Sequence, residues 1–422
     1  MNYQESLEYI NSITWRGSVL GLSRVKELSA RMGDPQKGLK FIHIGGTNGK
    51  GSTSAFLSSI LVKAGLKVGL FISPYIEVFN ERMQINNQNI SDEELAEIVT
   101  EIRPFADSME DRPTEFELNT VIAMIYFKRH NCDIVVLEVG MGGELDSTNV
   151  IDSPEAAVIT AIGLDHTAEL GDTIEKIAAT KAGIIKTGCD AVLYKQADSV
   201  TDIVRSRCEE VGAGFHVSEP ENIVFKSVDI DGQVFDTEKY GEIRIPLIGT
   251  YQKENMAVAL KVIEVLNKKG YDISDEAVVE GLKETRWPGR FEVVDKTPVF
   301  IVDGGHNPHG IKATTESLKN IFKDQKLVFI FGVMADKDYN IMLDMVCPLA
   351  QAMMCVTPDN PRALAAEKLA EIVNGRGVEA TACGSIGEAV EKAYERAGGT
   401  EPICALGSLY MIGDLKKYLK TR

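Results

Sequence analysis

A glycine-rich stretch at residues 41–53, FIHIGGTNGKGST, constrains this chain more than any other feature. The apolar run at 41–44 predicts a short buried strand, and apolar residues at helical spacing between 56 and 64 predict a helix that ends near Gly65. A strand, a glycine-rich loop and a helix form a cradle for a triphosphate, because glycines let backbone N–H groups approach phosphate oxygens. In this cradle Lys50 would neutralise phosphate charge, and the hydroxyl of Ser52 would hold Mg²⁺.

The spacing of this loop departs from the common phosphate-binding pattern on both sides of the lysine. The common pattern has four residues between its first glycine and the Gly-Lys pair, and a serine or threonine directly after the lysine. Here three residues separate Gly45 from Gly49, and Gly51 separates Lys50 from Ser52. A glycine-rich turn without a ligand is the alternative, but the lysine, the hydroxyls and the strand–helix context favour a phosphate site.

The composition of the chain narrows its class and its partners. A length of 422 residues suggests two or three domains, and 44% hydrophobic with 25% charged residues is ordinary for a soluble globular protein. The formal net charge of -17 argues against nucleic acid or an anionic membrane as the main partner. Any anionic substrate must therefore be attracted by a local basic site.

The cysteines and the N-terminus indicate a cytoplasmic protein. The seven cysteines are scattered without a CxxC pair, so we expect free, buried thiols rather than disulfides or a zinc site. The first ten residues are polar and acidic, unlike a signal peptide. No run approaches the roughly 18 apolar residues of a membrane span.

Apolar runs alternate with helical patterns along most of the chain. Strands are predicted at 67–72, 134–139, 156–162 and 190–194, and helices at 91–103, 115–129, 173–183 and 252–268. The pattern over residues 3–32 predicts two amphipathic helices, interrupted by Gly17 and Gly21. The pattern over residues 221–248 predicts a small antiparallel patch.

A break in the pattern near the Trp287-Pro288 pair precedes a second alternating series, and we place the boundary at 293–298. We therefore predict two α/β domains. The first, over 1–295, is a parallel-sheet domain with the phosphate loop and the antiparallel patch. The second, over 299–422, is a smaller Rossmann-like domain.

Polar residues follow several predicted strands of the first domain. Ser73 lies just after one strand, Glu138 lies within another, and His166 follows a third. The carboxyl ends of parallel strands meet at one edge, where open α/β sheets bind ligands. A carboxylate in an apolar strand is costly unless it is paired or metal-bound, and Mg²⁺ prefers oxygen ligands. The alternative for His166 is a hydrogen-bonded turn residue.

Five further polar residues have plain structural alternatives. Lys181, near a predicted helix end, is by default an exposed charge that complements the helix dipole. Arg290 could stack on the neighbouring indole, and Asn255 could be an exposed helix residue. Asp303 and His306 could belong to a capped turn before a helix.

The sequence resembles the Mur ligase family of ATP-dependent amide-forming enzymes, and within it the folylpolyglutamate and dihydrofolate synthases. The matching motifs occur in the family's order over nearly the whole chain. They are GLSR at 21–24, GTNGKGS at 46–52, SP at 73–74, NER at 80–82, LEVGMGG at 137–143, DSTN at 146–149, GLDH at 163–166, KAGI at 181–184, WPGR at 287–290, DGGHNP at 303–308 and GSLY at 407–410.

The resemblance implies ATP and two Mg²⁺ ions as cofactors. It makes Lys50, Lys181 and His166 catalytic, with Lys181 carried as a carbamate. Ser52, Ser73 and Glu138 would lie at the first Mg²⁺ and His166 at the second. The implied nucleotide-binding residues are Thr47, Asn48, Gly49, Lys50, Gly51, Ser52, Asn255, Arg290, Asp303 and His306.

The implied reaction forms an amide through an acyl phosphate in a cleft between two domains. A carboxylate of a reduced folate attacks the γ-phosphate of ATP, and the amine of L-glutamate then displaces phosphate. The resemblance implies these small-molecule substrates, and dihydropteroate is a further candidate acceptor. We expect a monomer, since the acidic charge balance gives no sign of a stable partner. Tyr75, Glu144 and Tyr251 stand where relatives often have other residues, and they bear on the choice of pterin acceptor.

Two other functions remain as alternatives. A ligase of peptidoglycan precursors would need a UDP-binding domain before the loop, where only about 40 residues stand. A nucleotide switch or ATPase with a phosphate loop would hydrolyse its nucleotide without an amino-acid acceptor. That class has no evident use for the second α/β domain or for Lys181.

Overall fold

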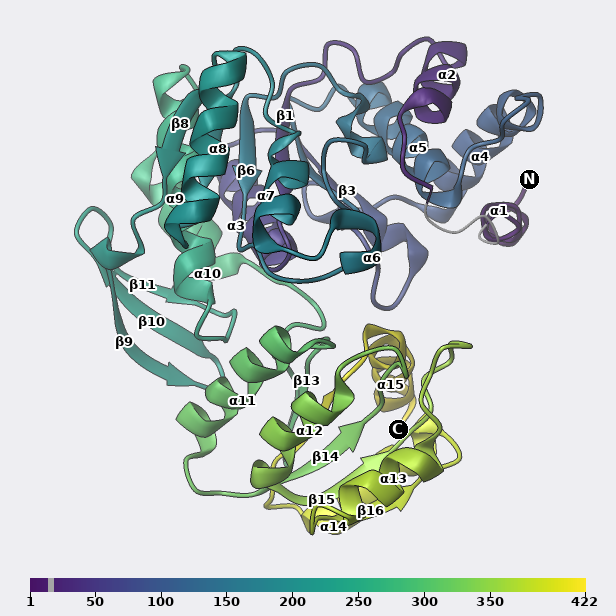
Figure 1. The fold of residues 1–422 in the computed structure, drawn as a ribbon, viewed down its shortest axis with the longest axis vertical. Helices are drawn as coiled ribbons and strands as arrows, with labels where there is room; N and C mark the ends of the chain where they lie inside the picture. Colours follow the sequence, from purple (N-terminus) through teal and green to yellow (C-terminus); the bar gives the residue numbers. More distant parts are fainter. Residues whose placement is uncertain (14–18) are drawn as a thin grey trace.

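The chain folds into two α/β units, one above the other in Figure 1, with a small antiparallel sheet beside them. The computed structural model describes residues 1–13 and 19–422, so the predicted helix interruption at Gly17 lies outside the described residues. The first unit holds the phosphate loop, and the second contains the C-terminus. This arrangement confirms the predicted fold class.

The first unit is built on a sheet whose central strands are parallel. In the described part of the chain the strands lie in the order β4 (Gln88–Asn89), β3 (Met83–Ile85), β2 (Val68–Phe71), β5 (Ile134–Glu138), β1 (Phe41–Gly45), β6 (Ala156–Ile159), β7 (Asp190–Leu193) and β8 (Gly214–Val217). The six from β2 to β8 in this order run parallel, and β3 and β4 form an antiparallel edge. The central strands are apolar on both faces because helices cover both faces. The loops that follow β1, β2, β5 and β6 therefore meet at one edge.

Helices bury the apolar residues of this sheet on each side. One face packs against α3 (Lys50–Lys63), α9 (Gln252–Lys268) and α10 (Asp275–Glu284). The helices on the other side are α1 (Tyr3–Asn11), α2 (Ser23–Arg31), α4 (Asp92–Asp107), α5 (Glu115–Arg129), α7 (Ile174–Ala182) and α8 (Asp198–Val211). The predicted antiparallel patch is the sheet of β9 (Ile223–Asp229), β10 (Gly232–Thr237) and β11 (Gly241–Ile245).

The second unit has its own sheet and its own core. Its strands lie in the order β12 (Glu292–Lys296), β13 (Val299–Val302), β17 (Ile403–Leu406), β14 (Leu327–Phe331), β15 (Ala350–Cys355) and β16 (Glu379–Ala382). The helices α11 (Pro308–Phe322), α12 (Tyr339–Val346) and α13 (Ala366–Asn374) pack on one face, and α14 (Ile386–Ala397) and α15 (Leu409–Thr421) on the other. β12 pairs antiparallel with β13, so the second sheet begins at Glu292, next to the predicted boundary at 293–298.

Two expectations about the class of protein can be compared with this structure. All seven cysteines are free and buried, as predicted. Among the described residues, no helix is both long enough and apolar enough to cross a membrane.

The close approach of α10 to α3 gives a test of this packing. An alanine Cβ at Gly281 would lie 2.5 Å from the Cα of Ile60 and 2.8 Å from its backbone nitrogen. Alanine favours a helix over glycine by about 1 kcal/mol, but backbone atoms cannot move aside as a flexible side chain can. We expect Gly281→Ala to lower the free energy of unfolding by about 1–3 kcal/mol in urea titrations.

Gly375→Ala is the matched control, since Gly375 has a φ of -60° and an added Cβ there would be no closer than 3.4 Å to its neighbours. We expect this variant to be as stable as the parent protein or slightly more stable. An equal response of the two variants would contradict the role assigned to Gly281.

Candidate active site

The phosphate loop lies between β1 and α3 with almost no free space around its backbone. Gly46 and Gly49 have φ angles of +146° and +89°, which favour glycine. An added Cβ at Gly46 would lie 1.8 Å from Thr160 Oγ1, and one at Gly49 would lie 2.4 Å from Asn255 Oδ1. These glycines therefore let the loop pack directly against the end of β6 and the start of α9.

The start of α3 provides N–H groups for an anion. The first hydrogen bond along this helix runs from Thr53 N to Gly49 O at 3.0 Å, so the N–H groups of residues 50–52 precede the helical bonding pattern. Together with the helix dipole they form a site for phosphate oxygens. An added Cβ at Gly51 would lie 2.3 Å from the indole of Trp287, which covers this first turn.

Two residues predicted to contact the phosphates, Thr47 and Asn48, already form hydrogen bonds within the protein. The backbone N–H groups of Thr47 and Asn48 both donate to Ala161 O, at 2.8 and 3.2 Å. The hydroxyl of Thr47 donates to Gly163 O at 3.0 Å. These bonds attach the first half of the loop to the segment after β6, so the free backbone donors lie in its second half.

Two lysines converge on one carbonyl of the loop. Lys50 Nζ donates to Gly46 O at 3.1 Å and to Thr47 O at 3.4 Å, and Lys181 Nζ donates to Gly46 O at 3.0 Å. Lys181 is only 5% exposed, so its interpretation as an exposed charge at a helix end is wrong. Burial, followed by the charge of Lys50, lowers the pKa of Lys181 to about 7.

A buried carboxylate lies at the same edge of the sheet. Glu138 ends β5 and is 4% exposed, and its Oε2 accepts a hydrogen bond from Ser73 N at 3.2 Å. Burial raises the pKa of Glu138, while the positive charge of Lys50 opposes this rise. A cation between the loop and β5 would therefore stabilise the ionised carboxylate.

The donors around this carboxylate suit Mg²⁺. Ser52 is buried and accepts a hydrogen bond from Gln252 Nε2 at 3.3 Å, and Ser73 is half-buried. Within the described residues there is no group of three or more His, Cys, Asp or Glu side chains that could hold a metal by themselves. A site of one carboxylate and two hydroxyls, completed by phosphate oxygens and water, fits the habits of Mg²⁺.

His166 lies at the same edge but faces solvent. It precedes α6 (Thr167–Leu170) with a left-handed φ of +49°, and its side chain is exposed. Its backbone N–H donates to Asp165 Oδ1 at 3.0 Å, which fixes the turn. An imidazole in this position is accessible to an ion or to a substrate group.

The second unit contributes a tight loop after β13. Asp303 is 2% exposed and accepts hydrogen bonds from Phe291 N at 2.8 Å, Gly305 N at 2.9 Å and Thr314 Oγ1 at 2.7 Å. Its carboxylate therefore holds the loop to the start of β12. The predicted contact of Asp303 with the nucleotide would be made by a carboxylate that already accepts these three hydrogen bonds.

Arg290, in the turn before β12, lies against the loop that carries His306. An added Cβ at Gly304 would lie 3.2 Å from Arg290 Nη1, and His306 Nδ1 lies 2.9 Å from Gly304 O. Burial, and then the nearby charge of Arg290, lower the pKa of His306. Asn255 is buried rather than exposed, and its Nδ2 donates to Gln252 Oε1 at 3.1 Å.

The two units touch across this site. Asn48 Nδ2 lies 3.1 Å from His309 Nδ1, and Lys337 Nζ lies 3.8 Å from Asp165 Oδ1. Sequence analysis identified neither His309 nor Lys337, because both partners are distant in the chain. Gln252 was also missed, although its spacing of one helical turn from Asn255 was a usable signal.

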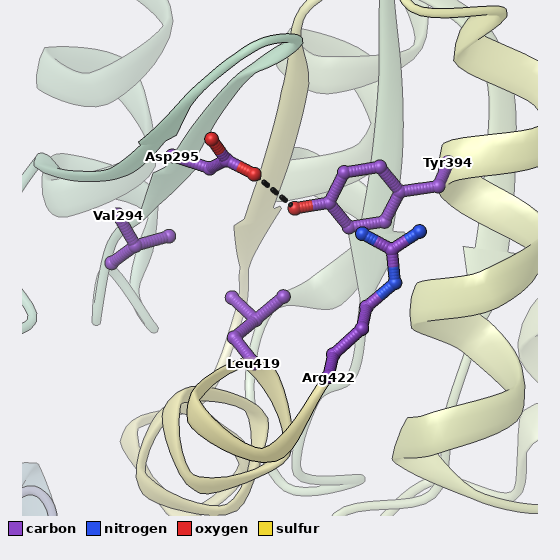
Figure 2. Close-up of a pocket in the computed structure, with 5 residues that line it drawn as sticks. All are labelled: Val294, Asp295, Tyr394, Leu419 and Arg422. Atoms are coloured by element: carbon purple, nitrogen blue, oxygen red, sulfur yellow. Dashed lines mark hydrogen bonds between the residues drawn. The ribbon is translucent and has the colours of Figure 1, made fainter.

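A surface pocket lies away from these residues, at the end of the second unit. Figure 2 shows its lining residues, which come from β12, α14, α15 and the residue after α15: Val294, Asp295, Tyr394, Leu419 and Arg422. Its volume is 470 Å³, and Tyr394 donates a hydrogen bond to Asp295 at 2.7 Å. None of the site residues predicted from the sequence lines this pocket.

Comparisons with known proteins agree with this geometry. The Mur ligase middle domain matches residues 44–263, and the glutamate ligase domain of Mur ligases matches residues 289–409. The chain is 38% identical over 432 residues to the dihydrofolate synthase/folylpolyglutamate synthase of Bacillus subtilis (strain 168), with 99% of each protein covered.

Solved structures give the same result. The apo form of L. casei FPGS matches with a TM-score of 0.87 and 31% identity, and 100% of both chains is covered. An FPGS complex with AMPPCP and folate matches with a TM-score of 0.85 and 30% identity, covering 99% of this chain and 100% of the other. The chain therefore belongs to the Mur ligase family of ATP-dependent amide-forming enzymes, in the branch of the folylpolyglutamate and dihydrofolate synthases.

Proposed function

We propose that this chain is a folylpolyglutamate synthase, which uses ATP to join L-glutamate to the γ-carboxyl of a reduced folate, with dihydropteroate as a second acceptor. The observation that carries the proposal is the convergence of Lys50, Lys181 and Glu138 at the phosphate loop, where the first turn of α11 of the second unit contacts it. The name of the B. subtilis relative and the FPGS complex with AMPPCP and folate support the choice of substrates. An ATPase without an acceptor is not favoured.

The first step joins two anions, and the site supplies positive charge for it. An oxygen of the folate carboxylate attacks the γ-phosphorus, the bond to ADP breaks, and an acyl phosphate forms. Lys50 and the N-terminus of α3 stabilise the negative charge on the phosphates. Ser52, Ser73 and Glu138 would hold one Mg²⁺ ion and His166 a second, and bound Mg²⁺ would add further positive charge.

Lys181 is suited to become a carbamate. With a pKa of about 7, its amine is uncharged in a large fraction of molecules near neutral pH. The amine lone pair would add to CO₂, forming an N–C bond and releasing one proton to solvent. The product is an anion in place of a cation, and it would join Glu138 and His166 as a ligand for metal.

In the second step the amine of L-glutamate attacks the acyl carbon, and phosphate leaves. Water would hydrolyse the acyl phosphate, so the site must exclude it. The contacts of Asn48 with His309 and of Lys337 with Asp165 support closure of the two units over the loop. Arg290, Asp303, His306 and Asn255 would contact the nucleotide within the closed site.

Further proposals concern the oligomeric state, the location and the partners of the enzyme. We propose that it works as a monomer in the cytoplasm, with small-molecule substrates and without nucleic-acid or membrane partners. The formal net charge of -17 supports the absence of polyanionic partners.

Phosphate release from Mg·ATP tests the reaction. We expect release that requires both L-glutamate and tetrahydrofolate, and a second assay with dihydropteroate tests the other acceptor. Lys50→Ala should lower the rate by about 10²-fold or more, because it removes a charge that stabilises the transition state. Lys63→Ala, on the exposed end of the same helix, is the control and should stay within about twofold of the parent. Release that does not depend on an acceptor would favour the ATPase.

The lowered pKa of Lys181 predicts a pH-dependent stability. Between the folded pKa of about 7 and the unfolded value of 10.5, the unfolded chain binds one more proton at this site, so stability rises with pH. The contribution is about 1.4 kcal/mol per pH unit in this window, and it is absent in Lys181→Met. In bicarbonate-free buffer, we expect the thermal stability of Lys181→Met relative to the parent to fall as the pH rises from 7 to 9.5.

A difference in stability that stays constant over this range would contradict the low pKa. In a separate sample with ¹³C-labelled bicarbonate, the parent should show a carbamate signal by NMR that Lys181→Met lacks. Absence of this signal in the parent would contradict the carbamate but not the pKa.

A further inference from the structure

The loop of residues 73–78 connects the metal-binding edge of the first unit to the second unit. It begins at Ser73, whose N–H donates to Glu138 at 3.2 Å. It is held from within its own unit by Glu81, whose carboxylate accepts the N–H groups of Ile76, Glu77 and Val78 at 2.7, 3.0 and 3.0 Å. The geometry of this loop is therefore defined by hydrogen bonds and not by side-chain packing alone.

The other side of the loop packs against α15, near the boundary of the two units (Figure 1). An added Cβ at Gly413 would lie 2.0 Å from Ile76 O, so the helix has a glycine where the loop backbone touches it. The side chain of Ile76 packs on the core of the second unit that includes Ile412 and Leu415. The loop is therefore in direct contact with α15 through both its backbone and the side chain of Ile76.

Lys416 lies one turn beyond Gly413 and binds two carboxylates. Its Nζ is 2.8 Å from Glu77 Oε1, and 2.9 and 2.8 Å from the two oxygens of Glu292. Glu292 Oε2 also accepts the N–H of Gly289 at 2.7 Å. One ammonium group thus connects the loop that begins at Ser73 to the turn that contains Arg290.

This ion pair is enclosed, which bears on its role. The side chain of Lys416 is 7% exposed and that of Glu77 is 15% exposed. Removing charges from water offsets most of the attraction between them, so a buried pair adds little net stability, and its better-supported use is to specify one arrangement of the chain. The two carboxylates outweigh burial and raise the pKa of Lys416, so the ammonium remains charged.

We propose that Lys416 is a positioning residue for ATP binding. By joining Glu77 to Glu292 it sets the spacing between the Ser73 loop, on the metal side, and Arg290, on the nucleotide side. Both would contact the same Mg·ATP molecule, and Lys416 would act through Glu77 and Glu292, the two carboxylates that its ammonium binds. The inference rests on the proposed function for the assignment of Ser73 and Arg290 to Mg·ATP.

Replacement of Lys416 by methionine tests this role, because methionine fills similar space without the charge. In Lys416→Met the carboxylates of Glu77 and Glu292 lose their common partner, although Glu77 keeps its ion pair with Lys420. We expect AMPPCP, in the presence of Mg²⁺, to bind about tenfold more weakly by calorimetry, a change of about 1.4 kcal/mol. The KM for Mg·ATP should rise by a similar factor, and the KM for L-glutamate should change by less than about twofold.

Two variants make the comparison specific. Lys417→Met is the matched control, because it removes a lysine from the same helix that is 58% exposed. Its Nζ lies 3.8 Å from Oδ1 of Asp414, also on this helix. Its affinity for AMPPCP should equal that of the parent. Lys416→Arg should restore most of the affinity, because a guanidinium can bind both carboxylates.

The proposal is overturned if Lys416→Met melts at a lower temperature but binds AMPPCP within twofold of the parent at 20 °C. If that variant does not fold, Glu292→Gln takes its place. It keeps an acceptor for Gly289 but loses one of the two charges that hold Lys416, and an unchanged affinity there would equally overturn the proposal. Binding of AMPPCP needs no acceptor, so a parent protein that fails to ligate glutamate would contradict the proposed function and leave the result for Lys416 standing.

Discussion

The close packing of the phosphate-loop backbone is the constraint on which the rest of the site depends. At each of its three inner glycines, the space that a Cβ would take is occupied by a residue from a different part of the chain. Thr160 occupies it at Gly46, Asn255 at Gly49 and Trp287 at Gly51. Any side chain at these positions would displace the end of β6, the start of α9 or the turn before β12. The loop therefore has one possible position relative to all three, and the anion site at the start of α3 is formed before a nucleotide arrives.

The charges around this loop are balanced for an anionic ligand. Lys50 and Lys181 share the carbonyl of Gly46, and the resulting repulsion and burial favour the uncharged form of Lys181. Glu138, at the adjacent strand end, is buried and has a raised pKa. Bound phosphates would offset the positive charge of the lysines, and a bound metal ion would stabilise the ionised form of Glu138. In this way a chain with a formal net charge of -17 presents a local site for triphosphate.

Much of the first unit could be predicted from its sequence because its signals are local. Mostly apolar runs identified β1, β5 and β6, and the glycines and Lys50 identified the loop between β1 and α3. Lys181 was harder, since its position near a helix end suggested an exposed charge, and only the packing of α7 against the loop buries it. The start of the second sheet at Glu292 could not be predicted from the sequence, because β12 is recognised by its pairing with β13, which is a tertiary feature.

The contacts between the two units beside the candidate site were invisible in the sequence, and they differ in kind. Asn48 meets His309 through one water-accessible hydrogen bond, and Lys337 meets Asp165 at 3.8 Å, so each contact contributes little and breaks readily. The contact of α15 with the loop of residues 73–78 is different, because it needs a glycine at 413 and encloses the ammonium of Lys416. A ligase must admit three substrates and then exclude water from an acyl phosphate. Weak polar contacts over the phosphate loop and an enclosed contact beside it meet these two requirements, since the first can open while the second keeps the units in register.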